Sequence, residues 1–423
     1  MRVHLKALGC RLNEAELEQW GQALLLAGHD LTESAAGADL LVINTCAVTA
    51  EAVRKSRQAI NRLHRDNPDA RLVVTGCYAS LSKAAVQAAL GVDLVLDNAD
   101  KDQLVQRVSE AFAVPPPPPR AAEPGANALF RRGRQRAFVK VQDGCRFRCT
   151  YCIVTVARGA ERSRPVAEIV REVQALHRSG VQEAVITGVQ VGGYGDGGVT
   201  TLSGLLRTLL AETDMPRLRV GSLEPWAVDR AFEQLLRHPR FMPHLHLPLQ
   251  SGSDTVLRRM ARRTRVADYQ AMVQRLRDAQ PALNLTTDII VGFPGETDAE
   301  WRQTLDAVAA IEFGHIHSFS YSDRAGTKAT RLPDKVSGPI KRARSRQLQA
   351  LAAEQRARRL HQAVGDHAQV LWEGVHQGYA AGYTEHYLRV TMPADAAVEN
   401  TVSRCRLVAV SDDGAQLLAE AVA

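Results

Sequence analysis

The chain has 423 residues, of which 45% are apolar and 23% charged, and its formal net charge is +7. This length predicts two or three domains, and the composition is typical of a soluble globular protein. No apolar run approaches the roughly eighteen residues that cross a bilayer, and the start MRVHLKALGC lacks the apolar core of a signal peptide. We therefore expect a cytoplasmic protein without a membrane anchor. The basic balance suits a polyanionic partner such as nucleic acid.

Residues 1–112 repeat one pattern, a short β-branched run that ends in a cysteine and precedes a helix-like segment. VHLKALGC, LLVINTC and RLVVTGC end at Cys10, Cys46 and Cys77, and DLVLDN fits a last strand. Strand–helix alternation predicts a parallel α/β sheet, whose strands all end at one ligand-binding edge. Each cysteine alone would be a small buried residue, but together we expect them to converge near helix starts. Three converging thiolates could hold an iron–sulfur cluster with one open iron.

Residues 113–130, AVPPPPPRAAEPGANALF, predict a stiff extended linker. Residues 131–361 then alternate amphipathic helices with six strand-like runs: AFVKVQDG, EAVITGVQV, RLRVGSLEP, HLHLPLQSG, LTTDIIVGFPG and HIHSFSYS. Six such units predict a partial (β/α)6 barrel rather than a closed eightfold one, followed by a long basic helix. Residues 362–423 contain four further short runs, AQVLWEGV, YLRVTMP, SRCRLVAVS and AQLLAEAV, with glycine-rich turns. They predict a small β-barrel, so the whole chain is of the α/β class with a β-barrel at its end.

The stretch DGCRFRCTYCIV places Cys145, Cys149 and Cys152 in a C-x3-C-x2-C spacing directly after a predicted strand. Thiolates bind soft metals, and thiols stay reduced in the cytoplasm, so the spacing indicates metal or redox chemistry rather than disulfides. A structural zinc site normally needs four ligands, and no fourth Cys or His lies nearby. Zinc and inert thiols therefore fit this spacing poorly. Three ligands on a four-iron cluster would leave one iron open to a substrate.

With Tyr151 before the last cysteine, this spacing resembles the radical S-adenosylmethionine (SAM) enzymes. The resemblance implies that the open iron chelates SAM and that reductive cleavage gives a 5′-deoxyadenosyl radical. Longer stretches resemble the methylthiotransferases more narrowly: LGCRLNEAELE, LLVINTCAVTAEAVRKSRQAI, LVVTGCYA, CTYCIVTVARGAERSRP, SLEP, HLHLPLQSGSDTVLRRMARR, TTDIIVGFPGET and FSYSDRAGTKA. The last sixty residues resemble the RNA-binding TRAM domain of that family, so that only the Pro-rich linker lies outside the resemblance. It implies two 4Fe–4S clusters, one on each cysteine triad.

The stretch VQDGCRFRCTYCI, with the later ARG, resembles the members that act on threonylcarbamoyladenosine in tRNA. This implies that SAM serves twice, as methyl donor to sulfur at the amino-terminal cluster and as radical source. The methylthio group would reach C2 of the modified adenosine beside the anticodon, with the first domain over the open face of the barrel. Implied partners are the tRNA anticodon loop and a low-potential, flavodoxin-like electron donor; we expect a monomer. Two residues depart from the family pattern, Thr155 where proline is common and Leu17 where Ser or Thr is common.

The resemblance also implies SAM contacts at successive strand ends, beside Tyr151. The candidates are Gly188 for the amino group, Ser222 and Glu224 on one strand face, Gln250 with Ser251 for ribose or carboxylate, and Ile290 to Gly292 for adenine. Each candidate also has a purely structural explanation. Gly188 could be an ordinary turn glycine, and Ser222 and Glu224 a polar strand end. Gln250 and Ser251 could cap a helix, and Ile290 to Gly292 could be a buried strand with a tight turn.

Several further residues carry a weaker signal. The pairs His244/His246 and His315/His317 alternate along strands and so share a face; metal binding is possible, but cleft or core histidines are favoured, and we assign no role. Basic runs at 131–136, 258–265 and 341–359 could bind RNA phosphates or form solvated faces. Aromatic residues of the terminal barrel could stack bases or fill its core: Trp372, Tyr379, Tyr383 and Tyr387. Cys405 is predicted to be a buried core thiol.

Three alternative functions remain open. The nearest is a sister methylthiotransferase activity, on isopentenyladenosine in tRNA or on an aspartate of a ribosomal protein. A radical SAM enzyme of other chemistry leaves the amino-terminal cysteines unexplained. A non-catalytic iron–sulfur RNA-binding protein would contain iron but release no deoxyadenosine when reduced with SAM.

Overall fold

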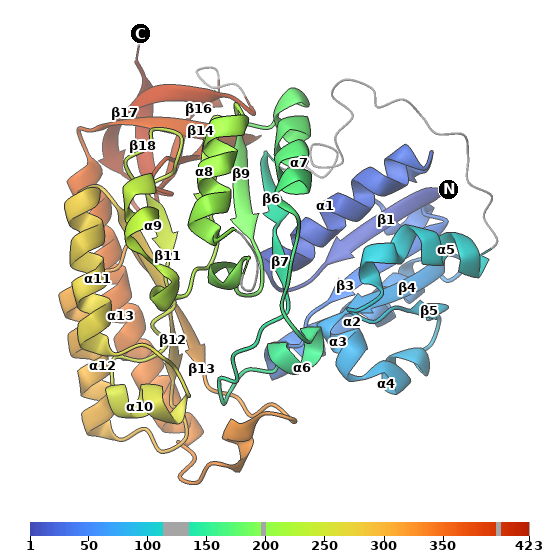
Figure 1. Cartoon of the computed structure of the whole chain (residues 1–423), viewed down its shortest axis with the longest axis horizontal. Coiled ribbons are helices and arrows are strands. Elements are labelled where there is room, and N and C mark those ends of the chain that lie inside the picture. The colour runs from blue at the N-terminus through green and yellow to red at the C-terminus, as the bar shows by residue number, and fades with distance from the viewer. Residues whose placement is uncertain (113–134, 196–199, 395–398, 423) are drawn as a thin grey trace. The chain divides into compact units, whose positions relative to one another are not determined.

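The computed structural model describes residues 1–112, 135–195, 200–394 and 399–422 (Figure 1). These residues form two compact units. Unit 1 comprises Met1–Arg162, Thr187–Val189 and Ser322–Thr327, and unit 2 comprises Ser163–Ile186, Gln190–Tyr321 and Lys328–Ala423. The predicted linker at 113–130 lies outside the described residues. Both predicted cysteine triads belong to unit 1.

Unit 1 contains the predicted parallel sheet. Its strand order is β2-β1-β3-β4-β5, and every neighbouring pair is parallel. The strands are β2 (Asp30–Leu31), β1 (Arg2–Ala7), β3 (Leu40–Thr45), β4 (Arg71–Gly76) and β5 (Leu94–Val95). The central strand β3 is buried along its whole length, as expected for a parallel strand covered on both faces. Strand β2 is an addition, because two residues carry no recognisable periodicity.

Helices cover both faces of this sheet (Figure 1). One core packs α1 (Arg11–Leu26) and α5 (Leu104–Phe112) against Leu40 and Val42 of β3. The other core packs the second set of helices against alternate β3 residues: α2 (Ala50–Asp66), α3 (Cys77–Leu81) and α4 (Lys83–Gln87). Side chains alternate across a strand, which is why neighbouring β3 residues enter different cores. Leu17, the departure from the family pattern, is fully buried in the first core.

The local sequence explains where these helices begin. The Thr49 hydroxyl accepts a hydrogen bond from the Ala52 amide at 3.0 Å and so caps α2. After β4 the chain forms two short helices, α3 and α4, which are separated at Ser82. Unit 1 continues with β6 (Arg136–Lys140), β7 (Gln142–Asp143) and α6 (Val154–Arg158). The Phe138 amide in β6 donates to the Glu18 carboxylate of α1 at 2.9 Å.

Unit 2 contains the remaining strands of the predicted partial barrel. They are β9 (Glu183–Thr187), β10 (Arg217–Val220), β11 (His244–His246), β12 (Asn284–Val291) and β13 (His315–Ser320). Strand β9 pairs with β10 and β12 pairs with both β11 and β13, always in parallel. Single bridges, Leu218 to Phe241 and Ser222 to His246, join the two groups. With β6, all six predicted strand runs of the central region are therefore strands.

Helices alternate with these strands, as predicted: α7 (Val166–Arg178), α8 (Leu202–Glu212), α9 (Arg230–Leu235), α10 (Asp254–Arg259), α11 (Val266–Ala279), α12 (Asp298–Ile311) and α13 (Gly338–Ala363). A reciprocal capping box between Thr297 and Glu300 starts α12. The predicted long basic helix is α13, in which Arg344 is buried against Glu296 at 2.7 Å rather than exposed. Among the described residues, no helix is both long and apolar enough to span a membrane.

The C-terminal residues form a closed barrel in the order β14-β15-β16-β18-β17. Its strands are β14 (His367–His376), β15 (Tyr379–Thr384), β16 (Arg389–Pro393), β17 (Val402–Val410) and β18 (Leu417–Ala421). Four were predicted; β15 was missed because its sequence YAAGYT reads as a glycine-rich turn. Cys405 is fully buried in the barrel core, as predicted, beside Trp372.

Two buried arginines attach this barrel to β10. Arg217 and Arg219 both pair with Glu183 of β9, at 2.7 and 2.8 Å. Arg217 also donates to the backbone oxygens of Gln369 and Thr384, each at 3.0 Å. Because these charges are buried, their pairing with a carboxylate and with backbone carbonyls of β14 and β15 fixes the contact.

The aromatic residues of the C-terminal barrel have different surroundings. Trp372 is fully buried in the barrel, and Tyr387 stacks between Tyr383 and His244, with ring centroids 4.7 and 4.6 Å away. Tyr379 is 54% exposed and so remains accessible for base stacking.

Candidate metal centre

The three amino-terminal cysteines gather at the edge where the parallel strands end. Cys10 immediately precedes α1, Cys46 follows β3, and Cys77 begins α3. Their thiols lie close enough to interact electrostatically with one another.

The backbone around Cys46 is built for close approach. Gly9 has a φ of +96°, and a Cβ added there would lie 2.4 Å from the Cys46 sulfur, so only glycine fits. The Ser56 hydroxyl accepts from the Cys46 amide at 3.2 Å and donates to the Cys46 carbonyl at 2.9 Å. Burial raises the pKa of the Cys46 thiol, and the neighbouring Cys77 thiol raises it further. Three soft sulfur donors at a tightly packed loop fit an iron–sulfur cluster, whose irons would stabilise the thiolates.

The second triad lies on the loop between β7 and α6, and its three cysteines are partly exposed. The Cys145 amide donates to the Gly159 carbonyl at 3.1 Å, which closes the base of the loop, and the Cys152 amide donates to the Cys149 carbonyl at 3.0 Å. Thr155, which stands where proline is common in the family, donates its hydroxyl to the Phe147 carbonyl at 2.7 Å. The departure therefore adds a hydrogen bond across the loop. This donor set, too, fits an iron–sulfur cluster.

Gln142 shapes the entry to this loop. Its amide nitrogen donates to the carbonyls of Asp143 and Gly144 at 3.0 and 2.8 Å. Its amide oxygen accepts from the Val189 backbone at 3.1 Å. A Cβ on Gly188 would lie 2.9 Å from the Gln142 carbonyl, so this glycine permits close approach of two backbone segments. The structure thus gives Gly188 a packing reason, alongside its predicted contact with SAM.

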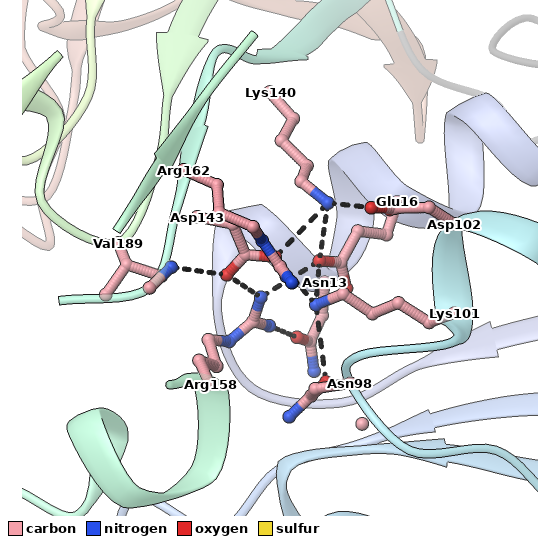
Figure 2. A network of polar contacts seen from close by, with 12 residues as sticks. Asn13, Glu16, Asn98, Lys101, Asp102, Lys140, Asp143, Arg158, Arg162 and Val189 are labelled. Carbon is pink, nitrogen blue, oxygen red and sulfur yellow. Dashed lines mark hydrogen bonds and ion pairs between the residues drawn. The ribbon is translucent and has the colours of Figure 1, made fainter. Parts of the chain in front are cut away.

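Unit 1 contains a buried network of charged side chains (Figure 2). It consists of two carboxylates and three cations, each 5% exposed or less: Glu16, Asp143, Lys101, Lys140 and Arg158. Every cation touches both carboxylates, at distances from 2.5 to 3.5 Å. Buried charges persist only when they are paired in this way. The network therefore ties α1 to the start and the end of the cysteine loop.

Arg158 connects this network to the thiols. Its guanidinium donates to Glu16, Asp143 and Asn13 at 2.9, 3.0 and 2.7 Å. It also interacts electrostatically with the sulfurs of all three amino-terminal cysteines. A fixed positive charge there favours thiolate over thiol. The ARG stretch thus has a physical role in unit 1.

Sequence reasoning missed most of this network. One available signal was Glu16, which lies on the apolar face of α1 because it is spaced four residues from both Leu12 and Trp20. A carboxylate on a buried face implies a buried partner. The partners themselves could not be predicted, since Arg158 is 142 positions away in the sequence.

Of the other predicted SAM contacts, Tyr151 lies on the cysteine loop of unit 1, and the rest lie at strand ends of unit 2. Ser222 and Glu224 follow β10; Ser222 is exposed, and a Glu224 oxygen accepts from the Gly192 amide at 3.3 Å. Gln250, with a φ of 72°, bridges to β12 because its carbonyl accepts from the Ile290 amide at 2.9 Å.

Two neighbouring residues serve the packing of unit 2. Gly292 has a φ of +72°, with Lys341 packed where a Cβ would project. Ser251 is buried, with its hydroxyl 3.2 Å from that of Thr304.

Comparison with known proteins gives the class first. Residues 139–308 match the radical SAM superfamily, and residues 2–97 match a family described as uncharacterized protein family UPF0004. The chain is therefore a radical SAM protein with an added amino-terminal domain. The superfamily implies SAM and a 4Fe–4S cluster as cofactors.

Relatives along most of the chain give the family. The threonylcarbamoyladenosine tRNA methylthiotransferases MtaB of Bacillus subtilis and Thermotoga maritima are 34% and 35% identical, each over 92% of this chain and over 89% and 90% of theirs. A tRNA-2-methylthio-N(6)-dimethylallyladenosine synthase of Paracoccus denitrificans is 34% identical over 96% of this chain and 94% of its own. The chain belongs to the radical SAM methylthiotransferase family, as its motifs predicted.

Solved structures agree on the fold. The radical SAM methyltransferase TsrM of Kitasatospora setae aligns with a TM-score of 0.57 and 17% identity, over 75% of this chain and 72% of TsrM. The cobalamin-dependent radical SAM enzyme OxsB aligns with a TM-score of 0.53 and 13% identity, over 78% of this chain and 54% of OxsB. At these identities the likeness concerns the fold alone.

Proposed function

We propose that the protein is a tRNA methylthiotransferase that modifies C2 of threonylcarbamoyladenosine next to the anticodon. In this proposal Cys145, Cys149 and Cys152 hold a 4Fe–4S cluster that also binds SAM. Together that cluster and SAM supply radical chemistry at the substrate. A second 4Fe–4S cluster is held by the remaining triad: Cys10, Cys46 and Cys77.

The observation that carries the proposal is the joining of two cysteine triads by one buried network within unit 1. Arg158 contacts Asp143, next to Gly144 and Cys145, and also interacts with the sulfurs of the other triad. A radical SAM protein with a single cluster has no need for the amino-terminal cysteine triad. Methylthiolation requires both a radical source and a sulfur site, so two neighbouring clusters suit it.

The choice of nucleoside rests on narrower support. The MtaB relatives carry threonylcarbamoyladenosine in their names, and Gln142 and Asp143 fit that subfamily. These two residues hold the cysteine loop, through the Gly144 carbonyl and through Arg158. The dimethylallyladenosine synthases share about as much sequence identity with this chain as the MtaB relatives do. Isopentenyladenosine is therefore the second candidate.

SAM contacts are proposed at Tyr151, Gly188, Ser222, Glu224, Gln250, Ile290 and Gly292. The strand ends at which six of them lie support this assignment, since barrel enzymes bind ligands there. RNA would be held by electrostatic contacts with basic runs and by stacking, with Tyr379 as the exposed aromatic of the barrel. A flavodoxin-like electron donor, a monomeric state and a cytoplasmic location stay predictions.

The domain boundaries also stay a proposal. We keep 1–112 for the amino-terminal domain, 113–130 for the linker, 131–361 for the radical SAM core and 362–423 for the TRAM domain. The change in sequence character at each boundary supports them.

We expect the cluster-loaded protein, with SAM and a reductant, to methylthiolate an anticodon stem-loop RNA that contains threonylcarbamoyladenosine. The matched control is the same RNA with isopentenyladenosine, and mass spectrometry of the digested nucleosides gives the readout. Product only from the control RNA would reassign the substrate. Iron in the protein without deoxyadenosine release would favour the non-catalytic alternative.

A further inference from the structure

One histidine from each alternating pair meets an aspartate on neighbouring strands of unit 2. His246 lies on β11, Asp288 on β12 and His317 on β13. Asp288 and His317 are partners in the parallel register, and His246 pairs with Thr286, two residues before Asp288. All three side chains therefore share one face of the sheet. The neighbours Leu245, Ile289 and Ile316 are buried on the opposite face.

The three side chains are close enough to share one ion. Their ligand atoms all lie within 4.8 Å of one another, and His246 Nε2 is 3.3 Å from Asp288 Oδ1. Bonds of about 2.0–2.2 Å from a common metal place two ligand atoms roughly 3 Å apart. The His246–Asp288 distance already meets that requirement. His317 is exposed, and its ring meets that of His246 edge-on with the ring centroids 5.6 Å apart.

Hydrogen bonds orient the His246 ring for this role. Its Nδ1 lies 2.9 Å from the Thr286 hydroxyl oxygen, which is itself 3.4 Å from the Leu245 carbonyl. If the hydroxyl donates to that carbonyl, it accepts from His246 Nδ1–H. The lone pair of Nε2 then faces the Asp288 carboxylate, and two acceptors at that distance need either a proton or a metal ion between them. Metal-binding histidines are oriented by a hydrogen bond of this kind on the other nitrogen.

We propose that His246, Asp288 and His317 form a binding site for a divalent first-row metal ion. Two imidazoles and one carboxylate suit zinc, iron(II), cobalt or manganese, and they leave coordination positions open for oxygen ligands. Ser222 is in register with His246 and so shares this face. The three residues belong to unit 2, whereas both cysteine triads belong to unit 1. It does not depend on the proposed tRNA substrate.

The test measures zinc and iron together in the full, cluster-loaded chain. After equilibrium dialysis against zinc, we expect one zinc per chain in addition to an unchanged iron content. Asp288→Asn and His317→Gln each keep the side-chain size and should weaken zinc binding by roughly 100-fold, with iron unchanged. His367→Gln, an exposed histidine on β14, serves as the matched control and should bind zinc like the wild type.

Two results would overturn the proposal. One is that the only zinc bound is zinc that has replaced lost iron. His246 and Asp288 would then be a simple ion pair. The other is equal zinc binding by the wild type, Asp288→Asn and His317→Gln, which would locate the zinc elsewhere. A fold defect in the variants is recognised separately, because it would lower the iron content and the thermal midpoint.

Discussion

Cys46→Ala is expected to retain SAM cleavage and to lose methylthiolation, whereas Cys145→Ala is expected to lose both. The two cysteines belong to different triads of unit 1, one at the sheet edge and one on the loop after β7. Removing one ligand of three should disable the cluster to which it belongs. Only the loop cluster is proposed to bind SAM. The separation of the two activities therefore follows from the two-cluster arrangement.

The measurement is the yield of deoxyadenosine and of methylthiolated nucleoside from the same reaction, with iron content as a check. Cys405→Ala is the matched control, because Cys405 is a buried thiol of the C-terminal barrel far along the chain from both triads. It should resemble the wild type in both products. Normal methylthiolation by Cys46→Ala would remove the second cluster from the account.

Arg158→Met is expected to destabilise unit 1 severely. The substitution keeps an unbranched side chain but leaves Glu16 and Asp143 buried with one fewer cation. Breaking a buried ion pair by removing one partner costs about 3–5 kcal/mol. For a unit of this size, that lowers the thermal midpoint by roughly 6 °C or more. Calorimetry of the intact protein gives the midpoint of the transition of unit 1.

Arg54→Met is the matched control, since Arg54 forms an exposed ion pair with Glu51 on α2 of the same unit. Exposed pairs add little to stability, so its midpoint should stay near that of the wild type. Equal midpoints for Arg158→Met and Arg54→Met would show that the buried network adds no more than a surface pair.

The same network predicts how stability depends on acid. Burial alone would raise the pKa of Glu16, but Arg158, Lys101 and Lys140 together lower it from 4.5 to about 2. The unfolded chain therefore takes up this proton at a higher pH than the folded chain. The stabilisation is complete above pH 4.5 and is lost as the pH falls toward 2. Without Arg158 the folded-state pKa of Glu16 should lie closer to 4.5, so this acid-dependent loss of stability should be smaller and should end at a higher pH than in the wild type.

The sequence was sufficient for regular elements but not for long-range contacts. Three β-branched runs that end in cysteine predicted β1, β3 and β4 and their parallel pairing, because period and composition are local properties. Strand β15 was missed, since its glycines weaken the strand pattern although the closed barrel supplies partners on both sides. Propensity is overridden there by tertiary pairing.

The candidate site could be predicted from the sequence to about the same extent as the fold. The cysteine spacing identified both triads, and repeated strand ends explained why Cys10, Cys46 and Cys77 should meet. What holds them is a set of contacts such as Arg158 with Glu16, which joins residues far apart in sequence. No local pattern encodes such a pair; only the folded arrangement brings it together.

The most direct test of the central claim is mass spectrometry of tRNA nucleosides from cells with and without this gene. The account predicts that 2-methylthio-threonylcarbamoyladenosine disappears and its unthiolated parent accumulates in cells that lack the gene. The wild-type gene should restore the product, and the Cys46→Ala gene should not. An unchanged level of 2-methylthio-threonylcarbamoyladenosine in cells without the gene would contradict the proposed substrate.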